Sequence, residues 1–199
     1  MLKFFVRFLA VGLLSAGVAV AQPADKFVNV NPPQPTEPGK VEVLEFFAYT
    51  CPHCAVLEPL VEKWKADLPS NVTFTSVPVA FNQAMKPFQY FFYSLEAVGR
   101  LDLHPKFFVA LHQEKKRLFS QEAMIDWAVD QGVDRAQFTA AMNSFGVKSK
   151  ATRADQLAKG YAIQGTPSIA VGGRYLTSPS EAGGYQQTID VANELIKRF

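Results

Sequence analysis

The two cysteines of this 199-residue chain stand in one tetrapeptide, Cys51-Pro52-His53-Cys54. Two thiols this close can pass between a dithiol and a disulfide by exchange with a thiolate of another molecule. The tetrapeptide lies where a predicted helix begins, and the first backbone N–H groups of a helix lack partners within it. These groups and the helix dipole stabilise a thiolate at Cys51 by up to ~2 kcal/mol, which would lower its pKa from about 8.5 to about 7.

Pro52 and His53 are also consistent with a stabilised thiolate at Cys51. Pro52 suits the first helical turn, because the N–H that it lacks would be unpaired there. His53 lowers the pKa of Cys51 further if its imidazole donates to the sulfur or is charged beside it; the alternative is a surface histidine. A stabilised thiolate favours the dithiol, so the disulfide is readily reduced. We expect Cys51 to be the exposed attacking sulfur and Cys54, one turn into the helix, to be buried and to resolve a mixed disulfide.

Two other uses of the cysteines explain the spacing less well. A structural disulfide between Cys51 and Cys54 would close almost no loop and would stabilise little. A zinc site needs four ligands, and only His53, His104 and His112 are available besides the cysteines, with His53 inside the loop itself. The sequence therefore predicts no metal site.

The elements that must position the motif lie on either side of it. Val41–Tyr49 is a nearly continuous apolar run rich in aromatic and β-branched residues, which predicts a strand buried on both faces. Cys51–Asp67 has helical spacing, and Pro59 predicts a kink within it. Its apolar side comprises Val56, Leu57, Leu60, Val61 and Trp64, with Glu58, Glu62, Lys63 and Lys65 mostly off that side. Asn71–Val79 predicts a second strand.

A helical block follows the second strand. Ala80–Lys159 predicts mainly helices, with Ser120 and Asp134 as candidate N-caps. Aromatic residues recur through the block at helical spacing, and we expect most of them in the core.

Strand patterns return near the end of the chain. Thr166–Val171 and Arg174–Thr177 predict two strands, and Gly172-Gly173 between them is a two-residue hairpin signal. Tyr185–Phe199 predicts a closing amphipathic helix. The predicted order is therefore strand, helix, strand, helical block, hairpin and helix.

The first 21 residues have the pattern of a secretory signal peptide. Lys3 and Arg7 precede a short uncharged stretch, which ends in Ala19-Val20-Ala21. The uncharged stretch is too short to span a bilayer, which takes about 20 residues; the alternative is an uncleaved membrane anchor. Export would place the remaining chain in an oxidising compartment. Pro23–Gly39 is proline-rich and predicts an extended lead-in.

Composition and charge exclude several classes of protein. Apolar residues make up 48 % of the chain and charged residues 19 %, which excludes a disordered chain. The formal net charge is +2, but removal of Lys3 and Arg7 leaves 18 basic and 18 acidic residues, so 18 − 18 = 0. No basic run is interleaved with aromatic residues, so no nucleic-acid partner is expected.

The motifs of this chain resemble those of the thioredoxin superfamily, and more closely those of the bacterial periplasmic DsbA family. The resemblance is carried by Cys51-Pro52-His53-Cys54, Leu44-Glu45-Phe46-Phe47, Asn143-Ser144-Phe145, Val147-Lys148-Ser149 and Gly165-Thr166-Pro167. It implies an α/β thioredoxin fold with a large inserted helical domain. The expected organisation is a signal peptide at 1–21, a thioredoxin-like domain at 22–79 and 160–199, and an inserted helical domain at 80–159.

The resemblance also implies an activity. The family oxidises newly exported, reduced and unfolded proteins in the periplasm and is reoxidised by a quinone-linked inner-membrane partner. It implies a monomer with no bound cofactor, in which the Cys51–Cys54 disulfide is the reagent. It further implies that Pro167 is a cis-proline opposite the cysteines, that Thr166 and Pro167 line the substrate site, and that the Thr166 backbone pairs with the incoming peptide.

Two positions depart from the family pattern. The family has an acidic residue at Glu45, to which proton transfer beneath the cysteines is attributed, and burial of Glu45 in an apolar strand would raise its pKa. In well-known members a lysine on the next strand pairs with this acid, but the register predicts Ser76 here. The alternative for Glu45 is a surface position. Thr166 also replaces a valine that is common in that branch.

Three functions remain open. The leading one is a thiol-to-disulfide oxidase. A disulfide isomerase or reductase of the same fold is the alternative within the enzymes, although bacterial isomerases carry an extra dimerisation domain for which little chain precedes the first predicted strand. A redox-inactive peptide-binding chaperone that uses an aromatic-rich surface near Cys51 is the alternative outside them.

Overall fold

The computed structural model describes residues 25–199, so the predicted signal peptide lies outside the described residues. A five-stranded mixed sheet has the order β1-β5-β4-β2-β3. Its strands are β1 (Val28–Asn29), β2 (Val41–Phe47), β3 (Val72–Pro78), β4 (Ser168–Val171) and β5 (Tyr175–Thr177). Strand β2 lies between β3, which runs parallel to it, and β4, which runs antiparallel. The order of strand, helix, strand, helical block, hairpin and helix that the sequence predicts is confirmed.

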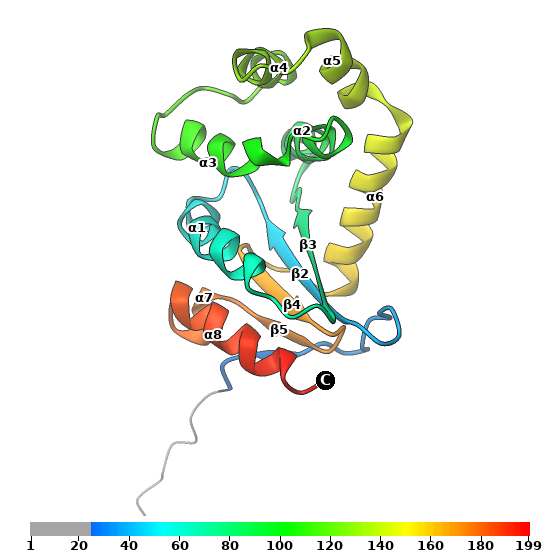
Figure 1. Ribbon diagram of the computed structural model, residues 1–199, viewed down its shortest axis with the longest axis vertical. Helices are drawn as coiled ribbons and strands as arrows, with labels where there is room; N and C mark the ends of the chain where they lie inside the picture. Colours follow the sequence, from blue (N-terminus) through cyan, green and yellow to red (C-terminus); the bar gives the residue numbers. More distant parts are fainter. Residues whose placement is uncertain (1–24) are drawn as a thin grey trace, which may run out of the picture.

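Helices surround the sheet, as Figure 1 shows. Eight α-helices lie among residues 25–199: α1 (Pro52–Ala66), α2 (Lys86–Ala97), α3 (His104–His112), α4 (Gln121–Asp130), α5 (Arg135–Asn143), α6 (Phe145–Gly160), α7 (Pro179–Ala182) and α8 (Tyr185–Ile196). Two short 3-10 turns, Gln83–Met85 and Leu101–Leu103, precede α2 and α3. Within residues 25–199, each helix is too short or too polar to span a bilayer.

Strand β2 separates two hydrophobic cores because successive side chains of a strand point to opposite faces. Val41 and Val43 face α1 and α8, where they pack with apolar residues of both helices. Leu44 and Phe46 belong to the other core, which extends into the helices between β3 and β4. The nearly continuous apolar run of β2 therefore reflects burial on both faces, as the sequence predicts.

All regular elements between β3 and β4 are helices. In Figure 1, α2 to α5 form a layer above the sheet. Its core is aromatic. The rings of Phe91 and Phe107 stack with centroids 4.1 Å apart, and Tyr49, just beyond β2, contacts Phe107 edge-on at 4.7 Å. Aromatic pairs of this kind stabilise by about 0.5–1.5 kcal/mol beyond the area they bury. The helical layer and the sheet thus share one core.

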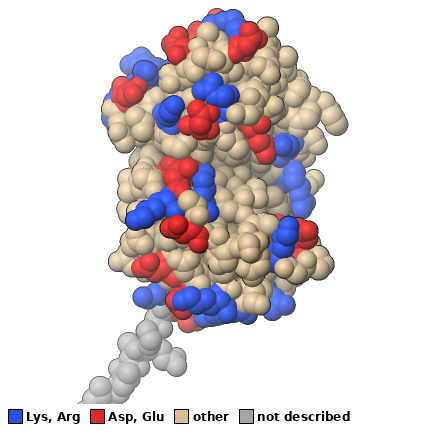
Figure 2. Space-filling view, in the orientation of Figure 1, with Lys and Arg blue, Asp and Glu red and all other residues tan. Residues whose placement is uncertain are grey.

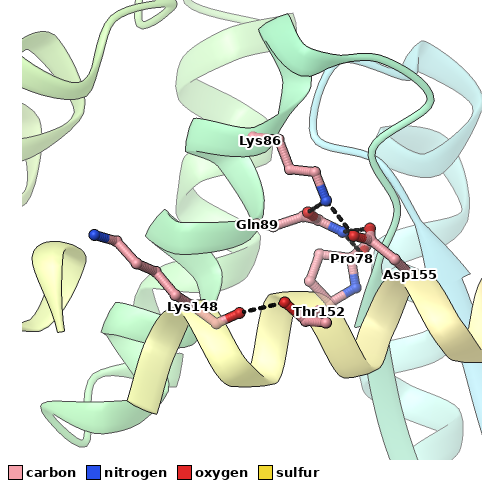
Figure 3. A network of polar contacts seen from close by, with 6 residues as sticks. All are labelled: Pro78, Lys86, Gln89, Lys148, Thr152 and Asp155. Carbon is pink, nitrogen blue, oxygen red and sulfur yellow. Dashed lines mark hydrogen bonds and ion pairs between the residues drawn. The ribbon is translucent and has the colours of Figure 1, made fainter. Parts of the chain in front are cut away.

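A polar network joins α2, α6 and the end of β3 (Figure 3). Gln89 is fully buried, and its side-chain amide donates to the Pro78 carbonyl at 2.9 Å and to Asp155 Oδ1 at 3.0 Å. Lys86 donates to Gln89 Oε1 at 3.1 Å and forms an ion pair with Asp155. The network satisfies a strand-end carbonyl that burial would otherwise leave unpaired.

The capping predictions are confirmed. Ser120 Oγ accepts from the Ala123 N–H at 3.2 Å at the start of α4, and Asp134 Oδ1 accepts from the Gln137 N–H at 2.8 Å at the start of α5. Ser144 caps α6 in the same way, which the sequence interpretation missed. Gly172 and Gly173 form the predicted hairpin turn, with φ of 58° and 71°.

Several boundaries differ from expectation. The lead-in is not merely extended, because Val28–Asn29 pairs with β5 and closes that edge of the sheet. Strand β2 ends at Phe47 rather than Tyr49, since the chain turns toward the helix and the Cys51 N–H donates to the Ala48 carbonyl at 3.0 Å. Helix α8 ends at Ile196 rather than Phe199.

Candidate active site

Cys51 is the N-cap of α1, with Pro52 at the first helical position. Its backbone is extended, with φ −88° and ψ 115°, and its side chain makes no capping hydrogen bond. The Cys51 carbonyl accepts the first helical hydrogen bond, from the Ala55 N–H at 3.3 Å. The sulfur therefore lies beside the free N–H groups of the first turn, as the sequence predicts.

The two cysteines have opposite environments, and both are free thiols here. Cys51 is half-buried, whereas Cys54 is 1 % exposed. The pKa of Cys51 falls from 9.0 to about 5, chiefly because the Cys54 thiol donates to its sulfur. Burial opposes the shift, while the N–H groups of Cys54 and His53 and the Thr166 side chain add to it. Burial raises the pKa of Cys54 far above its ordinary value, and the hydrogen bond and the charge of Cys51 add to this.

The fold brings Thr166 and Pro167 against the cysteines. The Thr166–Pro167 peptide bond is cis, as expected for this position. The Cys51 thiol donates to the Thr166 carbonyl with a separation of 3.2 Å. A loop 115 positions further along the chain thus contacts the motif because β4, which follows it, pairs with β2.

The imidazole of His53 contacts Tyr185. Its Nδ1 lies 2.6 Å from the Tyr185 hydroxyl at the start of α8, and the two rings are nearly parallel. His53 acts on the pKa of Cys51 through its backbone N–H, not through its imidazole. Tyr185 is a neighbour that sequence reasoning missed, because only the docking of α8 beside α1 reveals it.

A cleft of about 730 Å³ opens beside these residues. Its lining includes His53, Thr166, Pro167, Leu176 and Tyr185. The cleft is open to solvent along the loop that contains the cis-proline, so an extended peptide could reach Cys51 there. On the face of the molecule shown in Figure 2, acidic and basic side chains lie side by side rather than in separate fields.

Glu45 is buried, which excludes the surface alternative. Its side chain is 1 % exposed, on the β2 face that packs against α1. The register pairs Glu45 with Ser76, as predicted, and the Ser76 hydroxyl donates to Glu45 Oε2 at 3.0 Å. Burial raises the pKa of Glu45 to about 8, with the negative charge of Glu58 adding to the rise. His104 and Ser76 oppose the rise.

Glu58 was predicted to lie mostly off the apolar side of its helix, and this was wrong. Its side chain is 3 % exposed and lies 3.4 Å from His104 Nε2. His104 was considered only as a possible metal ligand. No group of three or more metal-ligating side chains occurs within residues 25–199. The position of Glu58, four residues after Cys54, was the one sequence feature that pointed to its burial. That spacing alone does not distinguish a buried acid from an exposed one.

Comparisons with known proteins agree with this geometry. Residues 36–191 match the family model described as "Thioredoxin". The chain is 52 % identical to the thiol:disulfide interchange protein DsbA of Bordetella parapertussis over 96 % of this chain and 95 % of the relative. It is 36 % identical to the DsbA of Pseudomonas aeruginosa over 87 % and 83 %.

Solved structures agree as well. The crystal structure of Pseudomonas aeruginosa DsbA superposes with a TM-score of 0.83 at 36 % identity, covering 87 % of this chain and 92 % of that one. The α/β thioredoxin fold with a helical insertion is confirmed. The family match and the identity over nearly the whole chain lead to one conclusion: the chain belongs to the DsbA family of thiol:disulfide oxidoreductases.

Proposed function

We propose that this enzyme is exported to the periplasm and donates its Cys51–Cys54 disulfide to newly exported, reduced and unfolded proteins. The observation that carries the proposal is the contrast between the cysteines: an accessible sulfur of low pKa beside a buried sulfur of high pKa. A low pKa makes Cys51 a good leaving group and stabilises the reduced enzyme, so the disulfide is easily transferred.

The reaction has two exchange steps. A substrate thiolate attacks Cys51 Sγ, the Cys51–Cys54 bond breaks, and the Cys54 sulfur leaves with the electron pair. Cys54 then takes up a proton, because burial disfavours its thiolate. A second substrate thiolate attacks the substrate sulfur of the mixed disulfide, and Cys51 leaves as a thiolate. The substrate is oxidised by two electrons, and the enzyme is reduced by two.

Thr166 and Pro167 are proposed to hold the substrate peptide in the cleft. The proposal is supported by the contact between Cys51 Sγ and the Thr166 carbonyl at 3.2 Å, because backbone groups of this loop can pair with an extended chain beside the reactive sulfur. Pro52 and the His53 N–H tune the thiolate. Glu45, buried on β2 with Ser76, is proposed as a proton relay, and its pKa of about 8 suits proton exchange near neutral pH.

The wider setting belongs to the same proposal. Residues 1–21 act as a cleaved signal peptide, 22–79 and 160–199 form the thioredoxin-like domain, and 80–159 form the inserted helical domain. The mature enzyme is a monomer with no cofactor besides its own disulfide. It is reoxidised by a quinone-linked partner in the inner membrane.

Oxidation of a reduced, unfolded protein by stoichiometric oxidised enzyme tests the proposal. The wild type is expected to transfer its disulfide, and Cys51→Ser is expected to be inactive. Cys54→Ser is first loaded at Cys51 with glutathione disulfide; a substrate thiolate should then displace glutathione and leave a substrate–Cys51 mixed disulfide that gel shift and mass spectrometry detect. Oxidation that survives in Cys51→Ser would refute the proposal. Rearrangement of scrambled disulfides without net oxidation would favour the isomerase, and peptide binding that is indifferent to both mutations would favour the chaperone.

A further inference from the structure

A second cleft, of about 500 Å³, adjoins the cleft of about 730 Å³ beside Cys51. We name the larger one the peptide cleft and the second one the Phe81 cleft, after a residue that lines it. Ala162 and Gln164 line both clefts, so the segment between them is a wall that the clefts share. An extended chain advances at most about 3.6 Å per residue, so these two residues lie within about 14 Å and 7 Å of Thr166, which contacts Cys51.

Backbone hydrogen bonds hold the surroundings of the Phe81 cleft in place. Beyond the end of α6, the Ile163 N–H donates to the Ala158 carbonyl at 2.8 Å, and Ala162 has a φ of 51°, the left-handed conformation in which many helices end. On the opposite side, the Val79 N–H donates to the carbonyl of Phe47, the last residue of β2, at 2.7 Å. The Phe81 cleft therefore lies at the end of the sheet from which the cysteine motif follows.

The Phe81 cleft has an apolar floor and a half-exposed aromatic ring. Val79 and Ile163 line it and are only 6 % and 9 % exposed, and Ala158 beside them is partly buried. Phe81 lines the same cleft with 50 % of its surface exposed. A single exposed phenylalanine is ordinary on a protein surface, but this one stands over a preformed apolar hollow. A large apolar side chain that entered the hollow would bury surface of its own and of Phe81.

The charges around the Phe81 cleft compensate one another. Lys86 and Asp155 line it and form an ion pair, which Figure 3 shows. Gln89 is fully buried and donates to Asp155 Oδ1 at 3.0 Å, which fixes the carboxylate. Lys159 adds one positive charge at the exposed rim. Because Asp155 is the one acid in the lining and is already paired, the Phe81 cleft favours an uncharged apolar side chain over a basic one.

We propose that the Phe81 cleft is a second binding site for the substrate chain, and that it takes a large apolar side chain of an unfolded protein while a cysteine of that protein reacts at Cys51. The occupant is the substrate chain because a peptide that pairs with the Thr166 backbone continues along the wall that both clefts share. Unfolded proteins expose large apolar side chains that folded proteins bury, so the site selects substrates that have not folded. The inference rests on the proposed function and adds to it how the substrate is selected.

Exchange of glutathione for short peptides tests the site. Cys54→Ser is loaded with glutathione at Cys51, and a peptide thiolate then attacks Cys51 Sγ and displaces glutathione as its thiolate. The peptides have about ten residues, enough to reach past the shared wall, with one cysteine in a neutral glycine and serine chain. One phenylalanine replaces glycine at successive positions on either side of the cysteine. Neutral peptides avoid attraction to Lys159. Mass spectrometry of acid-quenched samples gives the equilibrium constant of each exchange.

Phenylalanine should raise the equilibrium constant at least about fivefold over the peptide that lacks it. The increase should occur on one side of the cysteine and at every second position, because successive side chains of an extended chain point to opposite faces. Phe81→Ser, added to Cys54→Ser, should abolish the preference. Ala158→Gln, which puts a polar side chain on the floor, should do the same and keeps the test decisive if Phe81→Ser does not fold. Thermal unfolding shows which variants are folded.

Phe145→Ser is the matched control, because its ring is 86 % exposed at the other end of α6. It lies about 20 Å along the helix from Ala158 and should leave the preference for phenylalanine intact. Comparison of one peptide series across the variants cancels differences between the peptide thiols themselves.

Three results would overturn the second site while the proposed function stands. They are equal constants for all peptides, a preference that survives Phe81→Ser and Ala158→Gln, and a preference that Phe145→Ser removes as well. The second of these would assign the preference to the peptide cleft. If no peptide displaced glutathione, substrate thiolates would not reach Cys51, and the proposed function would be refuted together with the second site.

Discussion

The Tyr185 hydroxyl lies 2.6 Å from Nδ1 of His53, across 132 positions of the chain. This contact holds the imidazole of the Cys-Pro-His-Cys motif beside the peptide cleft. Residue 185 therefore belongs to the environment of the motif although it lies outside it. The side chain of Tyr185 can therefore adjust the equilibrium between the dithiol and the disulfide of Cys51 and Cys54.

Tyr185→Phe tests this relationship. Without the hydroxyl, His53 is free to turn toward Cys51, where a new hydrogen bond would stabilise the thiolate by about 1 kcal/mol. The equilibrium constant for reduction by glutathione should rise about fivefold, which tryptophan fluorescence in glutathione buffers can follow. Tyr175→Phe, in β5, is the control and should leave the constant unchanged. Equal constants for the two variants would show that Tyr185 does not restrain His53.

Titration of the thiolate absorbance at 240 nm should place the pKa of Cys51 near 5 in the reduced protein. The Cys54 thiol is the strongest donor to this sulfur, so Cys54→Ala should raise the midpoint by at least about one unit. A wild-type midpoint near 9 would contradict the environment described for Cys51.

The stability of the reduced protein should depend on pH through the same sulfur. The pKa of Cys51 falls from 9.0 to about 5 on folding, so its stabilising contribution is complete above pH 9 and is lost as pH falls through 5. Near pH 7 the reduced form should unfold at a higher temperature than the oxidised form. Calorimetry under anaerobic conditions should find that this difference in unfolding temperature becomes smaller toward pH 4. A difference that is constant with pH would exclude the thiolate as its source.

Glu45→Gln should stabilise the protein as pH rises. The folded pKa of Glu45 is about 8 against 4.5 for the ordinary carboxyl, so the folded state holds a proton that the unfolded state releases between these values. The ionisable Glu45 side chain therefore lowers the free energy of unfolding progressively from pH 4.5 to pH 8. The decrease is a few kcal/mol, since one pKa unit is about 1.4 kcal/mol. Urea unfolding at pH 4.5 and pH 8 should show the variant gaining only at the higher pH.

Gln89→Ala should cost about 2–4 kcal/mol, because it leaves the buried Pro78 carbonyl unpaired and opens a cavity between α2 and β3. Gln137→Ala, on the exposed side of α5, should change the free energy of unfolding by less than about 0.5 kcal/mol. Chemical denaturation measures both. Similar losses in the two variants would mean that the network of Figure 3 is not what holds the helical layer to the strand.

The sequence by itself determined the features that depend on near neighbours. Helical spacing, Pro52 at the first turn and the caps Ser120 and Asp134 predict their elements because capping and periodicity act within a few residues. The position of Cys51 at a helix start likewise follows from the residues beside it. The Glu45–Ser76 pairing was predictable because the two strands run in regular register.

Only the tertiary structure decided which distant side chains meet. Val28–Asn29 becomes a strand because β5 offers it a free edge, and its own residues carry too weak a pattern to show this. Glu58 is buried because α3 covers that side of α1, which turns an apparently solvated acid into an unpaired carboxyl. Tyr185 meets His53 because α8 docks beside α1. Burial and charge coupling arise from packing between elements, and the spacing of residues along the chain carries no record of them.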